Sequence, residues 1–171
     1  GIIGKDLCGI VAGDININAG SDGIKSTYDT DTTKGNVIIE GGNITIKASN
    51  DGIQAENILV INDGAINIKT NNGAADTTQT HTDNMYMGRG GFGFNNNKTT
   101  TTTDDTSESR KGIKAGNMLI INDGDITIDS DDDSVHCNSV IYIYGGTINA
   151  ATGDDGVHAD DLLTVNGGTI N

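Results

Sequence analysis

The chain repeats one short pattern six times, and this repeat limits the possible folds more than any other feature. In each copy a small residue precedes Ile or Val, and equivalent positions such as Asp133 and Asp155 lie 22 residues apart. Two copies are longer, because extra residues are inserted in them. Periods of this length are typical of one supersecondary unit that stacks on its neighbours. The copies begin at Gly1, Gly23, Gly52, Gly112, Ser134 and Gly156.

Within each copy, apolar residues alternate with polar ones, and a glycine is followed two residues later by isoleucine. These glycines are Gly13, Gly42, Gly64, Gly124, Gly146 and Gly168, and the isoleucines are Ile15, Ile44, Ile66, Ile126, Ile148 and Ile170. A period of two indicates strands with one buried face. Three short strands per copy, glycine corners and no helical run predict an all-β fold, a parallel β-helix or solenoid of about six coils with a 22-residue repeat.

Composition supports a single β-helix domain over residues 1–171. The chain has 25 glycines for corners, no proline to break the ladders, and a net charge of −14. This acidity argues against nucleic acid and anionic membrane surfaces as partners, and we expect no membrane insertion. Because Gly1 is already in phase with the repeat, we expect a mature or trimmed chain, extracellular or at the cell surface. Cys8 and Cys137 belong to coils one and five, too far apart for a disulfide, and are read as buried small residues.

Two insertions interrupt the repeat, at about residues 26–35 and 74–110. Both are expected to leave the rod near the same corner and to project from one edge. The longer one holds both phenylalanines in a stretch rich in glycine and methionine. Such a segment can be a lid over exposed strand residues or an adaptable contact surface.

Aspartates gather at the corner that opens each coil. Stacked carboxylates about 4.8 Å apart repel one another, so a cation is needed nearby. Lys111 can supply it in the middle of the rod, whereas only His136 and His158 are expected near the acids of the last coils. Clustered hard oxygen ligands on rigid loops suit Ca²⁺; the alternative is that each aspartate only shapes its turn. The candidate metal ligands are Asp22, Asp51, Asp131, Asp132, Asp133, Asp154 and Asp155.

A second column lies two residues after each corner glycine, and it consists of Lys25, Gln54, Lys114, His136 and His158. Cationic side chains beside an acidic, calcium-lined edge are what an acidic polysaccharide would meet. We therefore take Lys25, Lys114, His136 and His158 as candidate carbohydrate-binding residues. Tyr142 is a further candidate, the aromatic member of an outward stripe that also includes Ile38, Val60 and Ile120. That stripe can instead pack under the long insertion or against a neighbouring rod.

The repeated corners resemble those of a known family. The matching motifs are Asp-Gly-Ile followed by Lys or Gln, Asp-Gly-Val-His-Ala-Asp, and the turns Gly-Gly-Thr-Ile and Gly-Gly-Asn-Ile. They are similar to those of bacterial extracellular right-handed parallel β-helix proteins that bind carbohydrate and are structurally akin to pectate lyases. The resemblance covers nearly the whole chain. It implies a right-handed helix, Ca²⁺ at the aspartate corners and binding of cellulosic or acidic (pectic) polysaccharide, and it does not imply catalysis.

Two other functions remain open. A weak calcium-dependent polysaccharide lyase would need a neutral lysine as base, and Lys25 or Lys114 could serve. Carboxylates around a lysine favour its charged form, so we expect no catalytic residues and no enzyme. A structural subunit is the other alternative, since coils stacked end to end would form a head-to-tail oligomer or extracellular filament.

Overall fold

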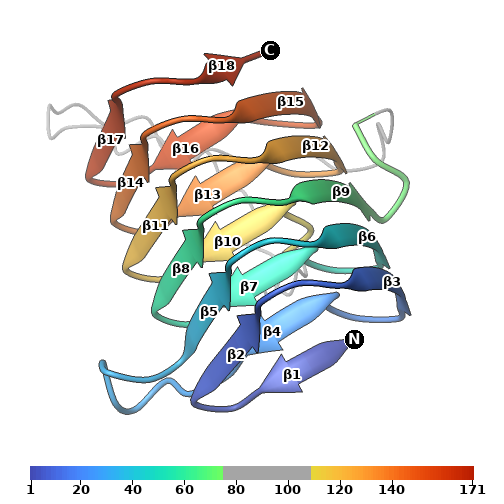
Figure 1. Ribbon diagram of the computed structural model, residues 1–171, viewed down its shortest axis with the longest axis vertical. Coiled ribbons are helices and arrows are strands. Elements are labelled where there is room, and N and C mark those ends of the chain that lie inside the picture. The colour runs from blue at the N-terminus through green and yellow to red at the C-terminus, as the bar shows by residue number, and fades with distance from the viewer. Residues whose placement is uncertain (75–108) are drawn as a thin grey trace, which may run out of the picture.

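The computed structural model describes residues 1–74 and 109–171, and within them the regular structure consists of strands alone. The predicted long insertion, including its phenylalanines, lies almost entirely outside the described residues. The strands form three parallel sheets of six, and each coil contributes one strand to each sheet (Figure 1). This arrangement confirms the predicted six-coil parallel β-helix. No described segment forms a helix with the length and apolar character needed to cross a membrane.

The three sheets, called A, B and C, run along the whole rod. Sheet A consists of β1 (Ile2–Gly4), β4 (Ile24–Ser26), β7 (Ile53–Ala55), β10 (Ile113–Ala115), β13 (Val135–Cys137) and β16 (Val157–Ala159). Sheet B consists of β2 (Leu7–Ile10), β5 (Asn36–Ile39), β8 (Ile58–Ile61), β11 (Met118–Ile121), β14 (Val140–Ile143) and β17 (Leu162–Val165). Sheet C consists of β3 (Asp14–Ala19), β6 (Asn43–Ala48), β9 (Ala65–Thr70), β12 (Asp125–Ser130), β15 (Thr147–Thr152) and β18 (Thr169–Ile170).

The predicted glycine column forms the corner between sheets B and C. All six of these glycines have positive φ, from 84° at Gly146 to 133° at Gly64. L-residues with a side chain rarely adopt such angles, so glycine is required at this corner in every coil. The recurrence of glycine in the sequence therefore reports a backbone conformation that recurs with each coil.

The core is a stack of identical side chains along the rod axis. Ile44, Ile66, Ile126 and Ile148 lie directly above one another in sheet C and are at most 2% exposed. Sheet C also has a second inward isoleucine column, which the sequence analysis did not identify; it contains Ile17, Ile46, Ile68 and Ile128, with Ala150 in the same register. Stacking equal residues at about 4.8 Å brings their side chains into close contact along the rod axis.

The two insertions leave the rod at different corners, so the expectation that they share one edge is wrong. The shorter one follows β4 and precedes β5, at the corner between sheets A and B. The longer one follows β9 and precedes β10, at the corner between sheets C and A. They therefore emerge on opposite sides of the short strands of sheet A (Figure 1).

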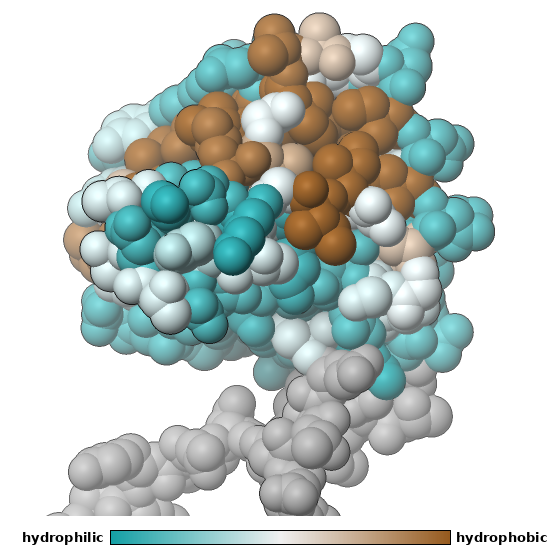
Figure 2. Space-filling model, turned by 90° about the horizontal axis from the view of Figure 1, so that it is seen from below, coloured by the Kyte–Doolittle hydropathy of each residue, from teal (hydrophilic) through white to brown (hydrophobic). Residues whose placement is uncertain are grey.

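Both outermost coils expose apolar side chains that are buried at equivalent positions elsewhere. At the β1–β3 end, Ile2 is 38% exposed, whereas its register neighbour Ile24 is fully buried, and Figure 2 shows apolar residues gathered over this end. At the other end, Leu163 is 43% and Val165 50% exposed. These surfaces are sections through the core of a solenoid.

Candidate functional site

The predicted cationic column forms one straight row on the outer face of sheet A. The strand register places Lys25 beside Gln54, Gln54 beside Lys114, Lys114 beside His136, and His136 beside His158. Successive members belong to adjacent strands, so their Cα atoms are about 4.8 Å apart. We call these five residues the sheet A row. Lys25, Lys114 and His136 are partly buried, and the side chain of His158 is 41% exposed.

The aspartates at the corner join each coil to the next. The Oδ1 atom of Asp22 accepts the backbone N–H of Asp51 at 3.2 Å, and that of Asp51 accepts the N–H of Lys111 at 2.8 Å. Asp133 accepts the N–H of Asp155 in the same way at 3.0 Å. A backbone N–H buried without a partner is costly, so these carboxylates have a structural role in each coil where they occur.

Lys111 interrupts this ladder, and Asp132 compensates for the missing carboxylate. Because Lys111 has no side-chain oxygen, the N–H of Asp133 donates instead to the Oδ1 atom of Asp132 at 2.9 Å. The Lys111 ammonium then bonds to the carboxylates of both Asp132 and Asp133 at 2.8 Å. The lysine thus supplies the positive charge that the stacked acids need, as the sequence analysis expected.

The second oxygen of each corner carboxylate orients a member of the sheet A row. Asp22 binds Lys25 at 2.8 Å, and Asp133 binds the Nδ1 atom of His136 at 2.8 Å. In each pair the aspartate precedes the row residue by three positions. The corner carboxylate therefore reaches the outward side chain of the strand that follows it. The equivalent pair Asp155 and His158 is 3.1 Å apart and more exposed.

The third coil departs from this pattern, because Gln54 takes the place of a cation. Gln54 bonds to Glu56, and the carboxylate of Asp51 lies 4.0 Å from the ammonium of Lys114 on the next strand. Lys114 also donates to the hydroxyl of Ser109 at 3.2 Å. The cation that serves Asp51 therefore comes from the neighbouring coil.

More cations surround the acids of the last coils than the sequence analysis expected. The prediction that only His136 and His158 lie near them is wrong. Arg110 binds the fully buried Asp131 at 2.9 Å, and Lys69 pairs with Asp129. Within the part of the chain that the structure describes, the Oδ1 atom of Asp131 and the Nε atom of Arg110 are buried without a hydrogen-bond partner.

Asp51 and Asp133 occupy equivalent corners, yet their pKa values shift in opposite directions. Burial raises the pKa of Asp51, and the distant Lys114 only partly opposes this. Burial would also raise the pKa of Asp133, but hydrogen bonds from His136 and Lys111 outweigh it and hold the pKa well below its usual range. Asp133 is thus stabilised as an anion, whereas Asp51 is not.

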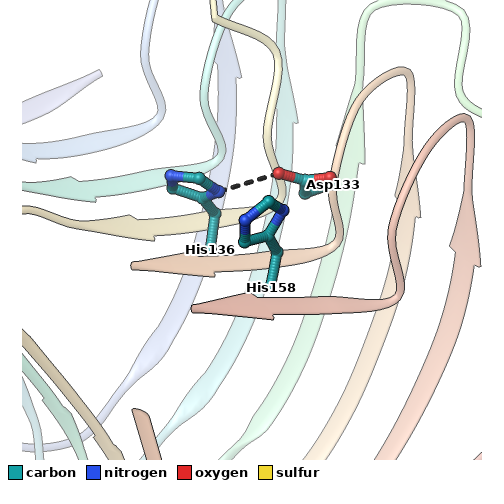
Figure 3. A group of neighbouring side chains, drawn as sticks. All are labelled: Asp133, His136 and His158. Carbon is teal, nitrogen blue, oxygen red and sulfur yellow. Dashed lines mark hydrogen bonds and ion pairs between the residues drawn. The ribbon is translucent and has the colours of Figure 1, made fainter. Parts of the chain in front are cut away.

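Two groups of ligand atoms lie close enough together to hold a cation, among residues 1–74 and 109–171. One consists of Asp132, Asp133 and Asp154; the other consists of Asp133, His136 and His158 (Figure 3). Within each group the ligand atoms lie within 4.8 Å of one another. Of the predicted metal ligands in the described residues, Asp22, Asp51, Asp131 and Asp155 belong to neither group.

The first group offers oxygen ligands, which fit Ca²⁺ in type but already have a cation. Calcium takes six to eight oxygens, so three carboxylates would form part of its shell. The ammonium of Lys111, bonded to two of these carboxylates, would have to move aside or share them. The donor set fits calcium, with Lys111 as its competitor.

Tyr142 lies on a different face from the other candidate sugar-binding residues. It is on β14 of sheet B, in register with Ile120 and Val60, and it is only partly buried. Its ring stacks on that of Tyr144, with centroids 6.2 Å apart and planes 18° apart. The sequence analysis missed Tyr144, although its spacing of two residues from Tyr142 was the available signal.

A hollow on the outer edge of sheet C contains a second group of cationic and polar side chains that the sequence analysis did not consider. Lys47 and Lys69 lie side by side in the strand register, and they line the hollow together with Asn18 and Asn71. The signal was present in the repeat, since Lys47 and Lys69 are 22 residues apart.

Comparison with known proteins bears on what these surfaces do. No curated protein and no solved structure matches the chain. A family model described as "Carbohydrate-binding domain-containing protein" matches residues 1–156. Because the match spans most of the chain, the protein belongs to this family of carbohydrate-binding domain-containing proteins.

Proposed function

We propose that this protein binds a polysaccharide along the outer face of sheet A, without cleaving it. The observation that carries the proposal is the sheet A row, in which polar side chains from five coils stand in one line. The family to which the chain belongs supports a carbohydrate ligand. This function is compatible with the extracellular or cell-surface location expected from the sequence.

The row offers a regular series of hydrogen-bonding groups to a regular polymer. Lys25 is held by Asp22, and His136 is held by Asp133, so the side chains are fixed before the ligand arrives. Groups whose rotamers are already restricted lose little entropy on binding. A chain of sugars laid across the strands would meet one such group about every 4.8 Å.

The charge of the protein separates the two polysaccharide classes. With a net charge of −14, the protein repels a polyuronate, and an acidic chain therefore needs a bridging cation. A neutral, cellulosic chain is not repelled and needs no bridging ion. An acidic, pectic chain would bind through Ca²⁺ held by Asp132, Asp133 and Asp154 beside the row. Calcium dependence is therefore expected for the acidic class alone.

Substitution in the row tests the proposal. Lys25→Gln with Lys114→Gln is expected to weaken binding to a soluble β-glucan or to polygalacturonate by at least tenfold, measured by affinity electrophoresis or calorimetry. The matched control is Lys47→Gln with Lys69→Gln, which removes the same charge from sheet C. If the two double variants lose the same affinity for the polysaccharide, the ligand does not bind specifically at the sheet A row, or only the net charge of the protein matters.

Calcium binding is expected to depend on Lys111. In the wild type, EGTA should lower Tm by about 5–10 °C when calcium was present at about 100 times Kd, where ligand binding adds about 2.7 kcal/mol. Lys111→Gln should be less stable without calcium and should gain more from it, because the competing ammonium is gone. Asp154→Asn should abolish the calcium response, and a response that persists in Asp154→Asn would exclude this cluster as the ion site.

A lyase reaction is the less favoured alternative. Its base would be a neutral lysine beside the acidic corner. Lys114, one of the two candidate bases, lies 4.0 Å from the carboxylate of Asp51 and donates to the hydroxyl of Ser109. Lys25 is likewise bound to a carboxylate, at 2.8 Å. This arrangement favours binding over proton abstraction.

Assembly along the rod axis is a second candidate function, favoured by the apolar surfaces at both ends. Ile2 at one end, and Leu163 and Val165 at the other, are all at least 38% exposed, whereas their register neighbours in the adjacent coil are fully buried. A second copy placed head to tail would continue all three sheets and bury these residues. Light scattering and negative-stain microscopy distinguish rods from monomers.

A further inference from the structure

The two histidines of the sheet A row form a close pair across adjacent strands. His136 on β13 and His158 on β16 are in register, and their ring centroids are 5.1 Å apart. Figure 3 shows both rings beside the carboxylate of Asp133. Their ring nitrogens and a carboxylate oxygen of Asp133 lie within 4.8 Å of one another.

Carboxylates fix the orientation of both rings. The Nδ1 atom of His136 lies 2.8 Å from Asp133, and its Nε2 atom lies 3.0 Å from the side-chain oxygen of Asn138. His158 has the same arrangement, with Nδ1 3.1 Å from Asp155 and Nε2 3.3 Å from Asp160. The contact between Asp155 and His158 has the form of a carboxylate that orients a metal-binding histidine, whereas Asp133 would itself be a ligand and would exchange its contact with His136 for the metal.

We infer that Asp133, His136 and His158 form a binding site for a borderline divalent transition metal such as Zn²⁺. Imidazole nitrogens are preferred ligands of zinc, nickel and copper, whereas calcium requires oxygens. Two imidazoles and one carboxylate provide three protein ligands. The side chain of His158 is 41% exposed, so water or a ligand can take the fourth position.

To close the site, one ring nitrogen of each histidine must exchange its present side-chain contact for the metal, and the ligand atoms must move slightly closer together. Two ligand atoms that each lie about 2.0–2.1 Å from zinc can be no more than about 4.2 Å apart. The ligand atoms of this group lie within 4.8 Å of one another, which is slightly more than that distance. His158 can supply this movement because it is the most exposed of the three, whereas Asp133 is almost fully buried. Lys111 does not lose its carboxylate partner when Asp133 binds a metal, since it also pairs with Asp132.

The site shares His136 and His158 with the sheet A row but does not require a polysaccharide, and it differs from the calcium cluster in its ligands. Asp133 is common to both groups, but the histidines belong to this one alone. Because zinc prefers imidazole nitrogens and calcium requires oxygens, zinc should outcompete calcium for the shared Asp133, and its binding should persist in millimolar calcium. Variants of Asp154 should leave it unchanged.

Calorimetric titration with ZnCl₂ in the presence of excess calcium tests the inference. The wild type should bind one Zn²⁺ per chain, and His158→Gln should bind at least tenfold more weakly. His158→Gln is at a partly exposed position, so its metal-free Tm should stay near that of the wild type and separate loss of the site from loss of the fold. His81→Gln, outside the described residues, controls for the third histidine of the chain.

The outcomes are distinct. Loss of zinc affinity in His158→Gln but not in His81→Gln or Asp154→Asn supports the site. Absence of saturable zinc binding, unchanged affinity in His158→Gln, or displacement of zinc by calcium would each overturn it. Polysaccharide binding to the same variants is scored separately, so failure of one hypothesis does not count against the other.

Discussion

Gly112→Ala is expected to destabilise the fold by about 3 kcal/mol or more, the upper range for overpacking a close-packed core. A Cβ atom at Gly112 would lie 2.4 Å from Cγ2 of Ile128 and 2.5 Å from the carbonyl oxygen of Ser134. Both contacts are far below van der Waals distance, and the oxygen belongs to the backbone of the next coil. Urea unfolding followed by circular dichroism gives the change in unfolding free energy.

The protein contains its own control for this prediction. One coil further on, the equivalent positions are occupied by Ser134 and Ala150, a larger and a smaller residue than Gly112 and Ile128. Ile128→Ala is therefore expected to relieve part of the strain of Gly112→Ala, with a coupling of at least about 1 kcal/mol in a double-mutant cycle. Simple additivity of the two changes would show that the side-chain contact is not the cause.

The second large effect is expected at Asp133. Asp133→Asn keeps an oxygen for the N–H of Asp155 but removes the buried charge that His136 and Lys111 bind. Breaking a buried ion pair costs about 3–5 kcal/mol, and because Lys111 retains Asp132 we expect about 3 kcal/mol at pH 7. Chemical unfolding of the wild type and of Asp133→Asn at a series of pH values measures this loss of unfolding free energy.

The pH dependence follows from the direction of the pKa shift. The pKa of Asp133 lies below that of the unfolded chain, so its contribution is complete above about pH 4 and is lost as the pH falls further. The difference between the wild type and Asp133→Asn should therefore shrink below about pH 4. A difference that stays constant down to pH 2 would argue against a charge effect.

Asp51→Asn is the matched control at an equivalent corner. The pKa of Asp51 is raised by burial, so ionising it at neutral pH lowers stability. The asparagine retains an acceptor for the N–H of Lys111, and this variant should be as stable as the wild type or more stable. Equal destabilisation by Asp51→Asn and Asp133→Asn would show that the corner needs the carboxylate shape rather than its charge.

The repeat made the architecture predictable from the sequence because each coil imposes the same requirements. A glycine at the same position of each coil marks a positive φ, and alternating isoleucines mark a buried face, so the number of coils and the register follow from the phase alone. The alignment of Lys114 with His136 is a direct result of that phase. Wherever the repeat is kept, a residue's sheet and its strand neighbours thus follow from its position in the sequence.

The partners within the site were less predictable because they depend on side-chain reach and not on phase. Lys111 and Asp133 are close in the repeat, but the bond from Lys111 to Asp132, one residue before the column, follows from the length of the lysine side chain. Arg110 reaches Asp131 for the same reason. Tyr142 illustrates the converse, since its outward direction and its spacing of two residues from Tyr144 follow from the phase, whereas the stacked geometry of the two rings does not.

The two buried cysteines make local opening of the rod measurable by thiol modification. Cys8 is 5% exposed in the first coil, Cys137 is fully buried in the fifth, and burial raises the pKa of both thiols. A thiol in this condition is inert towards modifying reagents until the strand that carries it separates from its neighbours. Since the two thiols lie near opposite ends of one stack, their modification rates report the opening of each end separately, and they distinguish fraying of single coils from cooperative opening of the whole molecule.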